Sequence, residues 1–130
     1  MIAMKWAKEL INVKEFELEK RVSRILQYLY NSDLETKCIV SGVDATGFLG
    51  NNLTQKLNET EWLNLEFTDI IALFNEDGQV FEMNLKVFNN IGDFQIIIRD
   101  GNSIDILGSG NEIPSEVLGD FKSQDIEPFN

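Results

Sequence analysis

The chain has 130 residues, 43% of them apolar and 25% charged, which excludes a disordered chain and predicts one globular domain over residues 1–130. Its 22 acidic and 11 basic residues give a formal net charge of −11 at pH 7, and histidine is absent. We expect no nucleic-acid partner, because nucleic-acid binding needs clustered lysine and arginine and this field repels phosphate.

The start of the chain and the cysteine content predict a soluble, cytoplasmic protein. Lys5 and Lys8 interrupt the first apolar residues, which does not fit a signal peptide. The longest apolar run, Ile70 to Phe74, has five residues, whereas a membrane-spanning helix needs ~20. One cysteine, Cys38, cannot form an internal disulfide, as is typical of a reducing compartment. We therefore expect no membrane association.

The N-terminal part of the sequence predicts helix. Between residues 14 and 30, apolar side chains recur at intervals of three and four, the period of an amphipathic helix. They are Leu18, Val22, Ile25, Leu26 and Leu29. Asn12 and Glu15 are spaced as in a capping box at its start. Trp6 and Leu10 are four residues apart, so residues 3–11 are also expected to be helical, with a bend at Asn12.

After residue 33 the apolar period shortens to two, which predicts strands. The expected strands cover residues 36–43, 63–67, 81–87, 94–99 and 103–107, with a further buried run at 70–74. Residues 51–61 are ambiguous. Asn75 to Gly78 has the composition of a hairpin turn, and Asp100 to Asn102 that of a tight reversal. Because the connections are too short for parallel crossovers, the strands are predicted to be antiparallel.

Near the C-terminus, residues 114–121 predict a short helix with Pro114 at its start, and the residues after it are expected to fray. The predicted architecture is therefore α+β. An N-terminal amphipathic helix packs on a four- to six-stranded antiparallel meander sheet, followed by a short C-terminal helix.

The sequence lacks the side chains that most catalytic sites require. Without histidine, Ser-His-Asp and Cys-His arrangements are excluded. Glu66 and Glu82 could form a carboxylate pair on adjacent strands, but their alternation with apolar residues favours a solvated position. The sequence from Asp100 begins like a calcium-binding loop, but its fifth position, which should supply an oxygen ligand, is Ile104. We expect no catalytic site, metal or cofactor, and therefore no enzyme.

Cys38 is expected to be a buried structural thiol. Core packing is expected for the strand phenylalanines, which are Phe67, Phe74, Phe81, Phe88 and Phe94. Trp62 fits two roles equally well, a core side chain or an anchor that contacts a partner.

The negative charge lies in the C-terminal part of the sequence. Residues 58–130 contain fifteen acidic and three basic residues, a net −12, whereas residues 1–31 carry +2. Such a field either keeps a soluble protein dispersed or steers a basic partner. A small acidic domain without catalytic groups is similar in overall character to the immunity proteins of bacterial toxin and immunity pairs, a similarity of size, charge and missing chemistry.

The leading hypothesis is therefore an immunity-type stoichiometric inhibitor of a basic bacterial toxin or nuclease. The candidate partner-binding residues are Trp62, Glu66, Asp69, Glu76, Asp77, Glu82, Asp93, Asp100 and Asp105. One alternative is a small-molecule-binding or enzymatic α+β domain, which predicts an apolar cavity with a few converging polar groups. Others are a phage-encoded inhibitor of a host defence nuclease, or a subunit of a larger assembly, which predicts an exposed strand edge or apolar patch.

Overall fold

The computed structural model describes residues 4–11, 18–57, 61–75, 78–118 and 121–128 as an α+β fold with one seven-stranded antiparallel sheet. The strands are β1 (Trp6–Ile11), β2 (Lys37–Ala45), β3 (Leu63–Glu66), β4 (Val80–Asn89), β5 (Gly92–Arg99), β6 (Ser103–Gly108) and β7 (Lys122–Asp125). The helices are α1 (Leu18–Ser32), α2 (Phe48–Leu57), α3 (Phe67–Asn75) and α4 (Ser115–Leu118). None of the described helices is long and apolar enough to cross a membrane.

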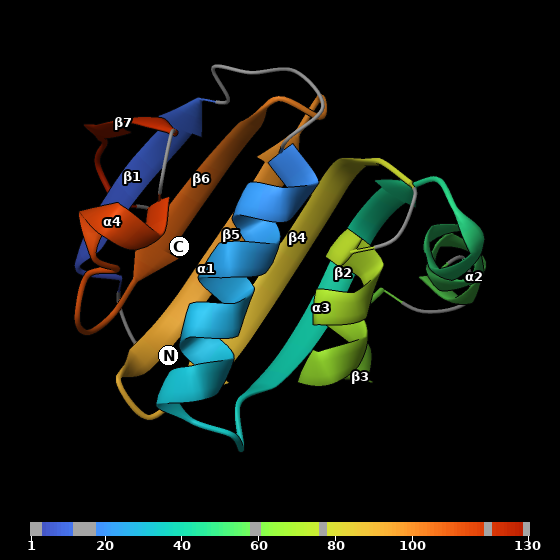
Figure 1. Cartoon of the computed structure of the whole chain (residues 1–130), viewed down its shortest axis with the longest axis horizontal. Coiled ribbons are helices and arrows are strands. Elements are labelled where there is room, and N and C mark those ends of the chain that lie inside the picture. Colours follow the sequence, from blue (N-terminus) through green and yellow to red (C-terminus); the bar gives the residue numbers. More distant parts are fainter. Residues whose placement is uncertain (1–3, 12–17, 58–60, 76–77, 119–120, 129–130) are drawn as a thin grey trace.

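The strand order is β3-β2-β4-β5-β6-β1-β7, and every neighbouring pair is antiparallel. Only β4, β5 and β6 follow one another as a meander. β1 and β2 run parallel with three strands between them, and α1 makes the crossover. β3 and β4 run parallel on either side of β2, and α3 makes that crossover. Both helices lie on the same face of the sheet, with α4 beside α1 (Figure 1).

Helix α1 forms because its apolar side chains fall on one stripe and are buried between the helix and the sheet. All five apolar positions of the predicted stripe are fully buried, which confirms the helix over the described residues. Residues 12–17, including the proposed cap at Asn12 and Glu15, lie outside the described part. At the other end of the helix, Asn89 of β4 donates a hydrogen bond to the Leu29 carbonyl at 2.8 Å.

The prediction of helix for residues 3–11 is wrong, because Trp6 to Ile11 form strand β1. Trp6 and Leu10 are four residues apart, but they also lie an even number of residues apart, which is the spacing of one strand face. β1 pairs with β6 on one side and with β7 on the other. These long-range partners satisfy its backbone on both edges and override the local helical signal.

The prediction that residues 70–74 form a strand leading into a hairpin is also wrong. Residues 67–75 form helix α3, whose apolar side chains are buried against α1. The buried side chains are Phe67, Ile70, Ile71, Leu73 and Phe74. The spacing of three and four fits a helix, but a run of five apolar residues fits both structures. The hairpin is absent from the described residues because β2 lies between β3 and β4; Glu76 and Asp77 of the proposed turn lie outside them.

Two predictions of the architecture also need correction: the sheet has seven strands instead of four to six, and residues 122–125 form β7 instead of fraying. Of the residues that the sequence left ambiguous, 51–57 belong to α2. Phe88 is 43% exposed and Phe81 is half-buried and outside the core cluster, so the prediction of core packing is wrong for both. The strands β2, β4, β5 and β6 and the short helix α4 confirm the remaining assignments, with ends that differ by a few residues.

Candidate functional site

One face of the sheet carries α1, α3 and α4, and no described helix covers the other face over β3, β2, β4 and β5 (Figure 1). We call this second surface the open face. On β4 its side chains alternate with the buried Met83, Leu85 and Val87. The outward residues of the four strands include Lys37, Ile39, Glu66, Glu82, Asn84, Lys86, Phe88, Asp93, Gln95, Ile97 and Arg99. At β6 and β1 the same side of the sheet is closed, since Leu107 and Ala7 are 0% and 3% exposed.

Trp62 belongs to the open face. The ammonium of Lys86 lies 4.5 Å from the centroid of the Trp62 ring. Lys86 points away from the buried side of β4, so its contact places the ring on the same side. Trp62 is half-buried and immediately precedes β3. Trp62 is therefore not a core side chain but an aromatic side chain on the surface of the sheet. Tryptophan is enriched at protein interfaces.

Carboxylates gather at one end of the sheet, around the β5–β6 turn. We call this group the acidic end; its members are Glu9, Asp44, Glu82, Asp100 and Asp105. Asp44 and Glu82 are paired across β2 and β4, and the backbone N–H of Asp100 donates to Glu82 at 3.4 Å. Glu9 and Asp105 are paired across β1 and β6. Strand register thus brings together residues that are as many as 96 positions apart.

Arg99 is the cation that contacts the acidic end. Its guanidinium nitrogen lies 2.8 Å from Asp105 and 3.5 Å from Glu9. Gln124 of β7 donates a further hydrogen bond to Glu9 at 3.0 Å. Burial raises the pKa of Asp105 above its ordinary value, and neighbouring Glu9 raises it further, whereas Arg99 opposes the shift. The Arg99 guanidinium therefore pairs with two of the five carboxylates, Glu9 and Asp105.

The opposite end of the open face carries charges of both signs. Lys37 lies opposite Glu66 on one side and opposite Phe88 on the other, and Phe88 in turn pairs with Asp93. The expected broad acidic field is therefore concentrated at one end of this face. Elsewhere the chain neutralises some of its own carboxylates, as where Lys8 lies within 4.0 Å of both Glu112 and Asp125.

The predicted contact residues do not form one cluster. Trp62, Glu66, Glu82 and Asp93 lie on the open face, and Asp100 lies in the turn at its acidic end. Asp105 is also at that end, but it is only 5% exposed and is held by Arg99. Asp69 lies on α3, on the covered side. Glu76 and Asp77 lie outside the described residues.

The carboxylate pair considered for acid/base catalysis is not brought together. Glu66 is opposite Lys37 at one end of β2, and Glu82 is opposite Asp44 at the other. Lys37 and Asp44 are seven positions apart along β2, which corresponds to roughly 20 Å of strand. A glycosidase pair is ~5–9.5 Å apart. The described residues also contain no group of three or more Cys, Asp or Glu side chains that could hold a metal ion.

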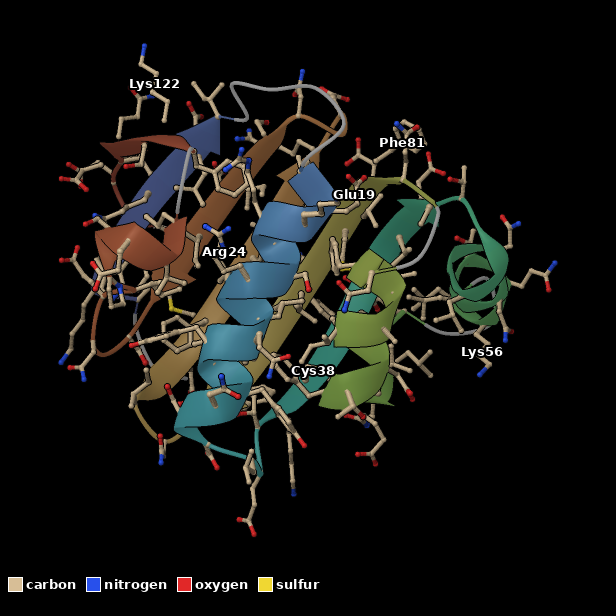
Figure 2. The ribbon with its side chains drawn as sticks, viewed as in Figure 1. Glu19, Arg24, Cys38, Lys56, Phe81 and Lys122 are labelled. Carbon is tan, nitrogen blue, oxygen red and sulfur yellow. The ribbon has the colours of Figure 1, made fainter. Side chains whose placement is uncertain are left out.

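Cys38 is buried on the covered face, as expected (Figure 2). Its thiol donates a hydrogen bond to the Leu65 carbonyl at 3.4 Å. Burial, reinforced by the negative charges of Glu66 and Asp69, raises the pKa of Cys38 to about 12. The sulfur is therefore a protonated thiol at neutral pH, which is a poor nucleophile.

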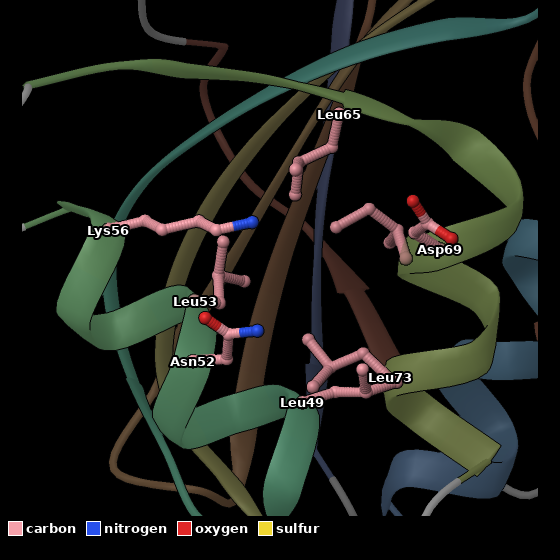
Figure 3. Close-up of a pocket in the computed structure, with 8 residues that line it drawn as sticks. Leu49, Asn52, Leu53, Lys56, Leu65, Asp69 and Leu73 are labelled. Atoms are coloured by element: carbon pink, nitrogen blue, oxygen red, sulfur yellow. The ribbon is translucent and has the colours of Figure 1, made fainter.

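The covered side contains a small pocket of about 160 Å³ between α2, α3 and β3 (Figure 3). Five aliphatic side chains form its floor and walls, and three polar side chains form its rim. The aliphatic residues are Leu49, Leu53, Leu65, Ile70 and Leu73, and the polar ones are Asn52, Lys56 and Asp69. Lys56 projects from α2 and Asp69 from α3, so the rim carries one charge of each sign (Figure 3).

Sequence reasoning missed Lys86, Arg99 and Lys56 as site residues. Lys86 and Arg99 alternate with buried strand residues, so the period of two could have placed them on the outward face. Lys56 offered no such signal, because the pocket forms only where α2, α3 and β3 come together in the fold. Comparison with known proteins adds no assignment: no family model, no curated protein and no solved structure matches this chain.

Proposed function

We propose that this protein is an immunity-type stoichiometric inhibitor, which binds a basic toxin or nuclease with its open face and blocks the partner's active site or substrate groove. The observation that carries the proposal is the acidic end, where five carboxylates lie along one end of the sheet beside its uncovered face and Arg99 contacts two of them. A groove that binds a polyanion is itself basic, so it complements this surface.

The open face supports the proposal with a second feature, a chemically mixed surface next to the acidic end. Trp62 supplies an aromatic side chain, and Ile97 and Phe88 add partly or largely exposed apolar groups. Interfaces typically combine an aromatic or aliphatic centre with a charged rim. We therefore assign Trp62 the role of anchor and the acidic end the role of steering the partner during association.

Candidate contacts are now restricted to Trp62, Glu66, Glu82, Asp93 and Asp100. Asp105 has a structural role instead, because its buried carboxylate holds Arg99 in place. Removing it would leave a guanidinium without its nearest partner, which perturbs the fold as well as binding.

The proposal predicts a gene for a basic toxin domain beside the gene for this chain, and the test uses both purified proteins. Association is followed by stopped-flow fluorescence at increasing ionic strength. We expect the association rate constant to fall about tenfold or more between low and physiological salt, because electrostatic steering is screened over ~10 Å at 0.1 M. An association rate that does not change with salt contradicts steering, and absence of a complex contradicts the inhibitor proposal.

Two matched variants locate the binding surface. Glu82→Gln together with Asp100→Asn removes two charges from the acidic end, and Glu112→Gln together with Glu116→Gln removes two from the other side of the molecule. The first pair is expected to slow association severalfold, and the second is expected to have a much smaller effect. Equal effects would show that only net charge matters.

The same two purified proteins distinguish the immunity proposal from two alternatives, a phage-encoded nuclease inhibitor and a subunit of a larger assembly. A phage-encoded inhibitor would bind a host defence nuclease and leave the neighbouring toxin domain active. A subunit of a larger assembly would associate through the open face without inhibiting either enzyme. Each of these results contradicts the immunity proposal.

A further inference from the structure

We propose that the pocket between α2 and α3 binds a free amino acid with a small aliphatic side chain, of the size of leucine. The aliphatic side chain would occupy the floor, the carboxylate would face Lys56, and the ammonium group would face Asp69. This inference does not depend on the proposed inhibitory function, since the pocket lies on the covered side of the sheet and the open face on the other.

The size of the pocket limits the ligand to a few atoms. Its volume is about 160 Å³, whereas sites for drug-sized molecules and cofactors are ~300–1,000 Å³. An engineered cavity of ~150 Å³ lined by aliphatic and aromatic side chains accepts benzene, a guest of six carbon atoms. A nucleotide is therefore too large, and an aliphatic side chain of four to six carbons has the right size.

The floor of the pocket selects an apolar group. Leu49, Leu53 and Leu73 approach from the two helices, and Leu65 closes the pocket from β3 (Figure 3). Apolar surface of this kind is stabilised by a ligand that removes it from water. A polar side chain would lose its hydration there without finding partners.

The rim selects a ligand with two charges of opposite sign. Lys56 and Asp69 extend from different helices on opposite sides of the opening (Figure 3). Among the described residues, neither group forms an ion pair with a protein side chain. Asn52 lies on the same helix as Lys56, and its amide can donate a further hydrogen bond to a carboxylate.

The charge of the whole chain favours the same choice. A net charge of −11 opposes the approach of a fatty acid or a phosphate. A purely cationic amine would face Asp69 but leave Lys56 without a partner. A zwitterion has no net charge, so it avoids both penalties while its two ends match the two rim residues.

Binding can be tested on the full chain by ¹H–¹⁵N NMR titration with L-leucine. We expect saturable shifts confined to the amides of α2, β3 and α3, with an affinity in the weak range typical of very small ligands. Two analogues serve as controls: 4-methylpentanoate lacks the ammonium group and isoamylamine lacks the carboxylate. Both are expected to bind about tenfold more weakly, since each loses one charge-assisted contact.

Two substitutions connect each end of the ligand to one rim residue. Lys56→Met should remove the preference for leucine over isoamylamine, and Asp69→Asn should remove the preference for leucine over 4-methylpentanoate. Lys122→Met, on the far edge of the sheet, is the matched control and should leave all three affinities unchanged (Figure 2).

The proposal is overturned if leucine causes no localised shifts up to about 10 mM, a concentration that exceeds the weak affinities expected here. It is also overturned if the two analogues bind as tightly as leucine, or if the two rim variants keep the wild-type preferences. None of these results bears on association with a basic protein, which is measured separately with the open-face variants.

Discussion

The ammonium of Lys86 on β4 lies 4.5 Å from the ring centroid of Trp62, although β2 separates β4 from the strand that Trp62 precedes. Neighbouring strands are ~4.8 Å apart, so this contact crosses two strand spacings. The lysine and the indole thus connect three strands on the open face. The lysine also holds Trp62, the proposed anchor, against the sheet before any partner binds.

Lys86→Met tests this contact. Methionine keeps an apolar stem of similar length but has no charge, so we expect a loss of about 0.5–1 kcal/mol in the free energy of unfolding, the usual size of an exposed cation–π interaction. Urea unfolding measures it. In a Trp62→Leu background the same substitution should have almost no effect; an equal loss in both backgrounds would contradict the interaction.

The buried carboxylate of Asp105 predicts a specific pH dependence. Its pKa is raised above the ordinary 3.8, mainly by burial. The folded state therefore keeps this proton at pH values where the unfolded state has released it. Folding stability should fall as pH rises from about 3.8 to the higher folded pKa, and this contribution should be constant outside that window.

The measurement is the difference in unfolding free energy between wild type and Asp105→Asn across pH 3 to 7, because asparagine does not titrate. We expect the wild type to lose stability relative to Asp105→Asn as pH rises through this window. A ¹³C titration of the Asp105 carboxyl provides the midpoint directly. In Arg99→Gln that midpoint should rise further, since Arg99 lowers it; a lower midpoint would refute the assignment.

Gly108 on β6 is required by the ring of Trp6 on β1. A Cβ atom at position 108 would come within 2.3 Å of the Trp6 ring. The ring is held there by an N–H···O bond of 3.0 Å to the Gly110 carbonyl and by an edge contact with Phe94. Gly108→Ala should therefore cost about 1–3 kcal/mol, the usual range for overpacking.

Chemical denaturation of Gly108→Ala, followed by far-UV circular dichroism, checks this cost. The matched control is the same substitution in a Trp6→Leu background, where the smaller side chain leaves room for the methyl group. The penalty should shrink there. If alanine is equally costly in both backgrounds, backbone conformation rather than the ring explains the glycine.

Asn89 connects the end of α1 to β4. Its amide nitrogen donates to the Leu29 carbonyl at 2.8 Å and to the Thr36 hydroxyl at 2.9 Å. The Leu29 carbonyl also accepts from the backbone N–H of Asp33 at 3.2 Å and from the Thr36 hydroxyl at 3.4 Å, so it keeps donors when Asn89 is removed. Asn89→Ala should therefore lower the free energy of unfolding by about 0.5–1.5 kcal/mol, the usual net contribution of a hydrogen bond.

Amide hydrogen exchange in the last turn of α1, measured alongside urea unfolding, locates the effect of Asn89→Ala. Exchange there should accelerate more than in the first turn. Asn90→Ala, at the exposed neighbouring position, is the control, because the side chain of Asn90 takes no part in these hydrogen bonds. Equal losses for the two variants would contradict the role assigned to Asn89.

Periodicity in the sequence was sufficient to predict α1, β4, β5 and β6. In α1 the buried residues follow the helical period from Leu18 to Leu29, and in β4 they alternate from Met83 to Val87. Each of these segments has one buried side, so the spacing of its apolar residues shows whether it is a helix or a strand. The α+β class follows from the same patterns.

The remaining assignments depended on partners distant in the sequence. Residues 6–11 became a strand because β6 and β7 are available on both sides, and residues 67–75 became a helix that crosses over β2. No local pattern contains the position of such partners, which explains why both segments were predicted wrongly.

The sequence by itself determined the total charge, the absence of histidine and the amphipathic first helix, since these depend only on composition and local period. Tertiary structure alone decided where the charge lies. Strand register gathers Asp44, Glu82 and Asp100 at one end of the open face, and the packing of α2 against β2 places Lys56 across the pocket from Asp69. Both arrangements join residues far apart in the chain, and long-range pairing of strands and helices is what brings such residues together.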